Sequence, residues 1–173
     1  MKILITTPIF PPEIRGPAIY TYQLCQQLKA KNQECVIVTF TQDPQPIPAV
    51  TVVSLSQGGN SFTRQWRLFR EILILGKNSE IIYAQGADVV GLASVLAGKL
   101  LSKKVIIKFV GDLSDELKRD FGHDNYLVRL ATWVSLRLAD KIIYPAKHLQ
   151  KSMNKRYSIP ADKTVVIYNA VDV

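Results

Sequence analysis

Short runs of β-branched and other apolar residues alternate with longer helical patterns along the whole chain. The runs are continuously apolar, which is typical of strands whose two sheet faces are both covered. Alternation of strands with helices favours parallel pairing through right-handed crossovers. We therefore predict an α/β fold with a doubly wound parallel sheet of about seven strands and helices on both faces. The expected strands are residues 2–7, 34–40, 50–55, 80–84, 104–110, 141–144 and 163–167.

The helices between these strands begin and end at recognisable residues. Pro17 suits the first turn of a helix, where its missing N–H is not needed, and this helix is expected to end near Asn32. Ser61 is the expected N-cap of a helix that ends near Leu75, with Gly76 as its stop signal. Further helices are expected over residues 87–101, 126–139 and 146–157.

The composition indicates one ordinary globular domain over residues 1–173. Hydrophobic residues make up 47% and charged residues 21% of the chain, which excludes the disordered class. No stretch approaches the ~20 apolar residues of a membrane span, and the opening apolar run is too short for a signal peptide. Cys25 and Cys35 lack metal-ligand spacing and are expected to be buried free thiols. A cytoplasmic location is the resulting prediction.

The loops after the strands are where an open parallel sheet binds its ligands. Four such loops qualify: 8–16, 85–86, 111–116 and 169–172. Gly16 stands directly before a helix start, where a backbone without a side chain can approach an anion closely; the alternative is that it only serves a turn. The G-x-G-x-x-G fingerprint and the P-loop are both absent, which argues against a nicotinamide dehydrogenase and an ATPase.

Four segments, in this order, carry a resemblance to a known family. They are KILITTPIFPPEIRGPAIYTYQLCQQLKAKNQECVIVTF, KFVGDLSDE, IIYPAKHLQKSM and VVIYNAVDV. Together they resemble the N-terminal domain of family-4 glycosyltransferases, which are retaining enzymes of the GT-B architecture. The resemblance covers essentially the whole chain and implies the Rossmann-like N-terminal half of a GT-B fold.

The resemblance implies transfer of a sugar from a nucleotide-sugar donor to a hydroxyl acceptor, either lipid-linked or a glycan. It implies no cofactor and no metal, the nucleotide-sugar being a co-substrate. In the family a second Rossmann-like domain holds most of the donor site, and this sequence does not contain it. The chain is therefore expected to be the acceptor-side half, inactive without a C-terminal donor-binding domain supplied in cis or as a separate chain. Both a cut fragment and a natural subunit of a split enzyme are compatible with this prediction.

The first loop carries two candidate binding residues. Gly16 matches the second glycine of the family's loop, which lies against the donor phosphate or the acceptor. Arg15 replaces the first glycine. It could supply a cation for a phosphate or block the close approach that glycine allows, and a solvated surface arginine is the alternative.

The loop after the fifth strand carries the two candidate catalytic residues, Asp112 and Glu116. Carboxylates near a cleft could orient an acceptor hydroxyl or act as a base. The family is thought to use the donor phosphate itself to accept the proton, so no protein nucleophile is required. Alternatively, Asp112 caps the following segment and Glu116 pairs with Lys118 or Arg119.

Five further binding candidates come from their positions: Gln85, Gly86, Gly111, Lys147 and Asn169. The first three residues lie where the fourth and fifth expected strands end. The lysine stands at a helix start where Ala146 replaces the family's serine, and the asparagine belongs to the segment that resembles the family's interdomain motif. His123 and His148 have no second ligand at metal spacing, so they are expected to be surface or capping residues.

The excess positive charge, a net +8, has one concentrated stretch. The helix from Ser61 carries Arg64, Trp66, Arg67 and Arg70, and a basic, aromatic-bearing helix can dock on an anionic membrane, here the inner membrane face. The alternative is a solvated face whose apolar side, with Leu68, Ile72 and Leu75, packs on the sheet. Nucleic acid is not expected, since there is no recognition motif and the other basic residues are dispersed.

Two other functional classes stay open. One is a stand-alone binding or scaffolding domain that recruits a partner domain or a membrane. The other is an isomerase of the nucleotide-sugar epimerase type, which shares the architecture and also needs a second half. The reading frame beyond Val173 would discriminate a cut fragment, a split enzyme and a non-enzymatic module.

Overall fold

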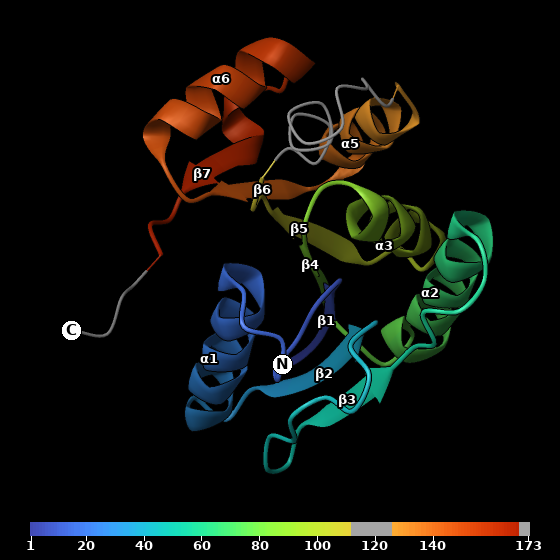
Figure 1. The fold of residues 1–173 in the computed structure, drawn as a ribbon. Helices are drawn as coiled ribbons and strands as arrows, with labels where there is room; N and C mark the ends of the chain where they lie inside the picture. Colours follow the sequence, from blue (N-terminus) through green and yellow to red (C-terminus); the bar gives the residue numbers. More distant parts are fainter. Residues whose placement is uncertain (112–125, 170–173) are drawn as a thin grey trace.

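The computed structural model describes residues 1–111 and 126–169 and contains one seven-stranded sheet (Figure 1). Its strand order is β3-β2-β1-β4-β5-β6-β7, and every pairing is parallel. The predicted doubly wound parallel sheet is thereby confirmed. The strands are β1 (Lys2–Thr7), β2 (Glu34–Thr39), β3 (Thr51–Ser54), β4 (Ile81–Gln85), β5 (Lys104–Lys108), β6 (Lys141–Tyr144) and β7 (Thr164–Val166).

Helices cover both faces of this sheet. One helix, α1, packs on one face next to β1 and β2, whereas α2, α3, α5 and α6 lie on the other face (Figure 1). This division follows from right-handed crossovers: connections that step toward β3 and those that step toward β7 pass over opposite faces. The helices are α1 (Gly16–Ala30), α2 (Ser61–Gly76), α3 (Val89–Leu100), α5 (Tyr126–Leu138), α6 (Lys147–Tyr157) and the 3₁₀ turn η1 (Ala161–Lys163).

The strand order reverses between β1 and β4. From β1 the chain steps outward to β2 and β3, and α2 then carries it back to β4 on the other side of β1. The connections that leave β1 and β4 therefore diverge at the carboxyl edge of the sheet. Such a divergence is the place where doubly wound sheets bind ligands.

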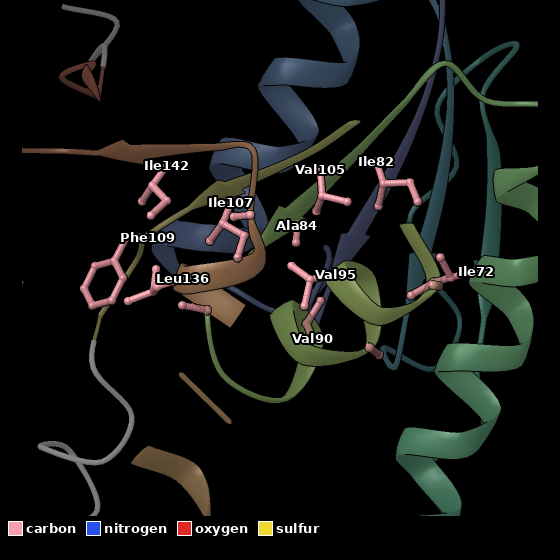
Figure 2. Packing of buried hydrophobic residues seen from close by; sticks show 14 of the residues in the cluster. Ile72, Ile82, Ala84, Val90, Val95, Val105, Ile107, Phe109, Leu136 and Ile142 are labelled. Atoms are coloured by element: carbon pink, nitrogen blue, oxygen red, sulfur yellow. The ribbon is translucent and has the colours of Figure 1, made fainter. Parts of the chain in front are cut away.

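The larger core lies between the sheet and α2, α3, α5 and α6 (Figure 2). Alternate residues of β4 and β5, such as Ile82 and Val105, point toward these helices. The helices contribute apolar side chains to the same core, among them Val95 and Leu136. Small residues let α3 come close: a Cβ added at Gly98 would lie 2.2 Å from a methyl carbon of Val105.

The element boundaries differ from the predicted ones in two instructive places. The N-cap of α2 is Asn60 and not Ser61, because the Asn60 side chain accepts a hydrogen bond of 2.9 Å from the backbone N–H of Thr63. The last strand starts one residue later than predicted, because Lys163 belongs to a 3₁₀ turn that precedes β7. Both differences are one-residue shifts and leave the sheet unchanged.

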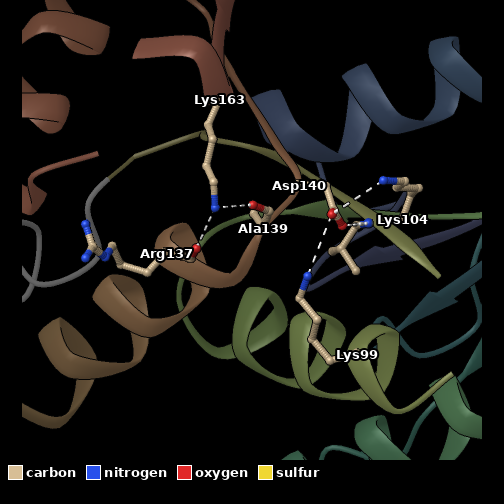
Figure 3. Close-up of polar contacts among 7 residues, drawn as sticks. Lys99, Lys104, Arg137, Ala139, Asp140 and Lys163 are labelled. Carbon is tan, nitrogen blue, oxygen red and sulfur yellow. Dashed lines mark hydrogen bonds and ion pairs between the residues drawn. The ribbon is translucent and has the colours of Figure 1, made fainter. Parts of the chain in front are cut away.

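Asp140 fixes the amino edge of the sheet, opposite the candidate ligand edge (Figure 3). Its carboxylate accepts a 2.8 Å hydrogen bond from the backbone N–H of Val105 and lies 3.7 Å from the Lys99 ammonium and 4.0 Å from that of Lys104. These charges therefore have a structural role, joining the α3–β5 turn to the α5–β6 turn.

Lys163 closes the end of α5 in a similar way. Its ammonium donates hydrogen bonds to the carbonyl oxygens of Arg137 (2.9 Å), in the last turn of α5, and of Ala139 (3.2 Å), directly after the helix (Figure 3). A cation at a helix C-terminus is also favoured by the helix dipole.

Two further sequence predictions concern burial. Cys25 and Cys35 are both buried and free, as predicted. A hydrogen bond with Cys35, together with burial, raises the pKa of the Cys25 thiol, so it is protonated at neutral pH. Within residues 1–111 and 126–169, no helix is long and apolar enough to span a bilayer.

Candidate functional site

A pocket of about 650 Å³ opens at the carboxyl edge of the sheet, where the strand order reverses. It is built by the loop between β1 and α1, the first turns of α2 and α3, and the residues that follow β5. The polar side chains on its wall include two cations, two carboxylates and two amides. They are Arg15, Arg64, Glu13, Asp88, Gln57 and Gln65.

The β1–α1 loop is held in place by a buried anchor. Phe10 is fully buried, and its backbone N–H donates a 2.7 Å hydrogen bond to the Thr41 hydroxyl oxygen. The Thr41 hydroxyl in turn donates to the Glu13 carboxylate at 2.5 Å. The backbone N–H of Arg15 then donates to the Glu13 carbonyl oxygen at 3.2 Å. The position of Glu13 and Arg15 on the pocket wall is therefore fixed by the core.

The pocket combines groups that attract an anion with two carboxylates, Glu13 and Asp88. Arg15 and Pro17 at the start of α1, Arg64 and Gln65 at the start of α2, and Asp88 at the N-cap of α3 all line it, so three helix N-termini meet there. Each N-terminus carries a partial positive charge. Within the described part of the chain, neither arginine makes an ion pair. A ligand with a phosphate and several hydroxyls matches these guanidiniums and carboxylates.

Gly16 and Gly86 are glycines for different reasons. Gly86 has a φ of +128°, a conformation that residues with a side chain rarely adopt, so the β4–α3 turn itself requires glycine. Gly16 has no positive φ, and a Cβ added there would meet nothing within 4 Å. The fold alone does not explain Gly16. Gly16 lies between the pocket residues Arg15 and Pro17. Because it has no side chain, a ligand has a clear path to the backbone there.

The structure places only some of the predicted binding residues on the pocket wall. Arg15 and Gly111 line the pocket. Gln85, at the end of β4, is buried with 1% of its surface exposed, and its Oε1 atom has no hydrogen-bond partner among the described residues. Lys147 and Asn169 are exposed and are not part of the pocket wall. Their roles stay predictions.

The two predicted catalytic residues, Asp112 and Glu116, lie outside the described residues, as does His123. Their roles likewise stay predictions. Gly111, the residue directly before Asp112, is on the pocket wall.

The predicted membrane-facing set is divided by the structure. Arg64 lines the ligand pocket, together with Ser61 and Gln65 from the same end of α2. Trp66, Arg67 and Arg70 line a separate hollow on the outer side of the helix. Arg64 therefore belongs with the ligand pocket.

Sequence reasoning did not single out Glu13, Asp88, Gln57 or Gln65. A usable signal existed for the first two. Glu13 lies inside the loop 8–16, and Asp88 follows the loop 85–86 by two residues. Both loops are expected at the carboxyl edge of the sheet. The two amides carry no such signal, because their place on the wall depends on where α2 and the β3–α2 connection lie.

Lys108 is a buried lysine that the sequence analysis placed only in a strand. It ends β5 with 1% of its surface exposed, and its ammonium donates a 3.2 Å hydrogen bond to the carbonyl oxygen of Ile167. It also lies 4.7 Å from the ring centre of Tyr20, whose hydroxyl is 3.3 Å from that of Tyr83. Burial lowers the pKa of Lys108 below its ordinary value.

A pH-dependent stability follows from this buried ammonium. The unfolded chain keeps the ordinary pKa of 10.5 and therefore binds more protons than the folded chain between the lowered pKa and 10.5. The contribution of Lys108 to the free energy of unfolding should thus rise with pH across that window, as the penalty of its buried charge disappears. We expect Lys108→Met to abolish this rise in urea titrations between pH 7 and 10. Parallel pH profiles for the two proteins would contradict it.

The sequence model of Glycosyltransferase Family 4 matches residues 14–173. The chain belongs to glycosyltransferase family 4. It forms the N-terminal Rossmann-like domain of the GT-B architecture, as its resemblance predicted. No curated protein sequence matches the chain significantly.

Solved structures with this fold include glycosyltransferases and epimerases. A glycosyltransferase from Rickettsia africae superposes with a TM-score of 0.66 at 16% identity, over 99% of this chain and 43% of its own. WaaG, a glycosyltransferase of lipopolysaccharide biosynthesis, gives 0.68 at 6% identity over 95% and 44%. A UDP-GlcNAc 2-epimerase from Neisseria meningitidis, bound to UDP-GlcNAc, gives 0.68 at 15% over 96% and 45%. This family-4 chain spans less than half of each.

Proposed function

We propose that this chain is the acceptor-side half of a retaining glycosyltransferase that transfers a sugar from a nucleotide-sugar to a hydroxyl acceptor. The observation that carries the proposal is the pocket at the switch point, where Arg15, Arg64 and three helix N-termini meet in a family-4 chain. A donor-binding second domain, in cis or as a separate chain, would complete the site. Without it, the chain is expected to be inactive.

The roles of the pocket residues follow from their chemistry. Arg15 and Arg64 suit the phosphate of a donor or of a phosphorylated acceptor, because guanidinium groups bind phosphate in a bidentate manner. Glu13 and Asp88 suit sugar hydroxyls, since carboxylates accept hydrogen bonds. Gly16 leaves room for the ligand at the start of α1.

Sugar transfer is proposed to need no protein nucleophile. The donor phosphate would accept the proton of the acceptor hydroxyl, and Asp112 and Glu116 would orient that hydroxyl. No cofactor is proposed. No cluster of three or more potential metal ligands occurs in residues 1–111 and 126–169.

Nucleotide-sugar binding draws support from a structural neighbour. The Neisseria meningitidis epimerase with this fold is bound to UDP-GlcNAc. The family match favours transfer over epimerisation, because it covers residues 14–173 of this chain, whereas the epimerases are similar at the level of fold. A cytoplasmic location fits the intracellular supply of nucleotide-sugars and is part of the proposal.

A product assay tests this function. The chain is incubated with UDP-GlcNAc and alcohol acceptors, alone and together with a donor-binding domain encoded beyond or beside it, and products are identified by mass spectrometry and NMR. We expect no product from the chain alone and a glycoside of retained anomeric configuration from the pair. Transfer by the isolated chain would overturn the half-enzyme proposal. An epimerised nucleotide-sugar in place of a glycoside would replace it with the epimerase alternative.

A further inference from the structure

The outer side of α2 carries a ridge of large exposed side chains. Phe62, Trp66, Arg70 and Ile74 follow one another at intervals of four residues, which places them on one side of the helix. The apolar members are well exposed: 75% for Phe62, 59% for Trp66 and 53% for Ile74. Three large apolar side chains in one exposed line are unusual on a helix that faces only water.

The ridge contributes little to the packing of α2. The helix packs through its opposite side, where Leu68 and Ile72 are buried in the core. The Trp66 ring contacts only its near neighbour Phe69 among the described aromatic residues, at 5.8 Å between ring centres. The apolar ridge therefore needs an explanation other than the stability of the fold.

Basic side chains lie within the ridge and beside it. Arg67 and Arg70 line a hollow of about 390 Å³ whose wall also includes Phe62 and Trp66, and Lys77 follows the end of the helix. Glu71 is the one acidic residue of α2. The Arg67 guanidinium donates hydrogen bonds to two neutral carbonyl oxygens and, within the described residues, has no ion pair. The positive charge is thus not neutralised locally.

We propose that this ridge docks the protein on the surface of an anionic lipid bilayer. Phe62, Trp66 and Ile74 would enter the interface, where aromatic rings are favoured, and Arg67 and Arg70 would bind lipid phosphates. Charge complementarity identifies the occupant: three cations against one acid on an apolar line match anionic head groups over acyl chains. The inference does not depend on glycosyl transfer, because it uses a different surface from the ligand pocket.

The fluorescence of Trp66 reports docking directly. The chain has two tryptophans, so Trp133→Phe leaves Trp66 as the sole reporter. This variant is titrated with phosphatidylcholine vesicles and with vesicles that also contain phosphatidylglycerol, and binding is confirmed by co-sedimentation. We expect a blue shift of the emission with the anionic vesicles and weaker binding as salt is raised. No shift, or equal binding to both kinds of vesicle, would overturn the proposal.

Matched variants locate the surface. Each cation near an anionic surface strengthens association about fivefold, so Arg70→Gln should weaken vesicle binding by about that factor and Arg67→Gln/Arg70→Gln by roughly 25-fold. Phe62→Ser should weaken it as well. Leu100→Ser changes an apolar residue that is 70% exposed on α3 and should leave binding unchanged, and Arg64→Gln in the ligand pocket should weaken binding less than Arg70→Gln does. Equal losses in the controls would overturn the assignment. So would binding of the ridge to an RNA oligonucleotide without binding to vesicles.

Discussion

Replacing Arg64 by glutamine is expected to weaken the binding of a sugar phosphate to this chain by about 10- to 100-fold. Arg64 lines the pocket at the start of α2, where helix N-termini and Arg15 already favour an anion. A hydrogen bond to a charged group contributes about 1.5–3 kcal/mol, and glutamine keeps much of the size while removing the charge. Isothermal titration calorimetry with glucose 1-phosphate measures the change.

Arg70→Gln is the matched control for this experiment. It makes the same substitution on the same helix, but Arg70 lines the outer hollow and not the ligand pocket. Sugar phosphate binding should therefore be unaffected by Arg70→Gln, whereas vesicle binding should be weakened less by Arg64→Gln than by Arg70→Gln. If both variants lower sugar phosphate binding equally, only the net charge matters and the pocket assignment fails.

Replacing Phe109 by alanine is expected to lower the free energy of unfolding by about 3–5 kcal/mol. Phe109 is fully buried directly after β5, and its ring centre lies 5.4 Å from that of Tyr144 (Figure 2 shows its place in the core). The substitution leaves a cavity between the sheet and α5 and removes an aromatic pair. Urea denaturation followed by circular dichroism gives the value.

Phe62→Ala provides the comparison, because the same residue type is 75% exposed on α2. We expect it to change the free energy of unfolding by less than about 0.5 kcal/mol. Phe109→Ala should also weaken sugar phosphate binding, since Phe109 holds the strand end that leads to Gly111 on the pocket wall. A loss below about 1 kcal/mol for Phe109→Ala would contradict the described packing.

The sheet could be predicted from the sequence because its strands are short, continuously apolar and separated by helical patterns. The N-cap of α2 was missed by one residue, since Asn60 and Ser61 are both good capping residues and only the contact with the Thr63 N–H decides between them. Such local choices depend on backbone angles that sequence patterns do not specify.

The candidate site was predicted in part. The strand-end loops identified Arg15 and Gly111 as pocket residues, because ligand edges follow from topology. The structure places Arg64 on the pocket wall, which the sequence did not indicate, because periodicity shows which residues share a face but not which face meets a pocket. That information comes from the path of α2 from β3 to β4 across the sheet.

The pocket at the switch point is proposed to bind a phosphorylated sugar. The most direct test is to map amide chemical-shift changes in the isotope-labelled chain as glucose 1-phosphate is added. The largest shifts are predicted in the β1–α1 loop and at the starts of α2 and α3, and they should disappear in Arg64→Gln. Shifts confined to another surface, such as the start of α6 around Lys147, or no shifts at all, would contradict the claim.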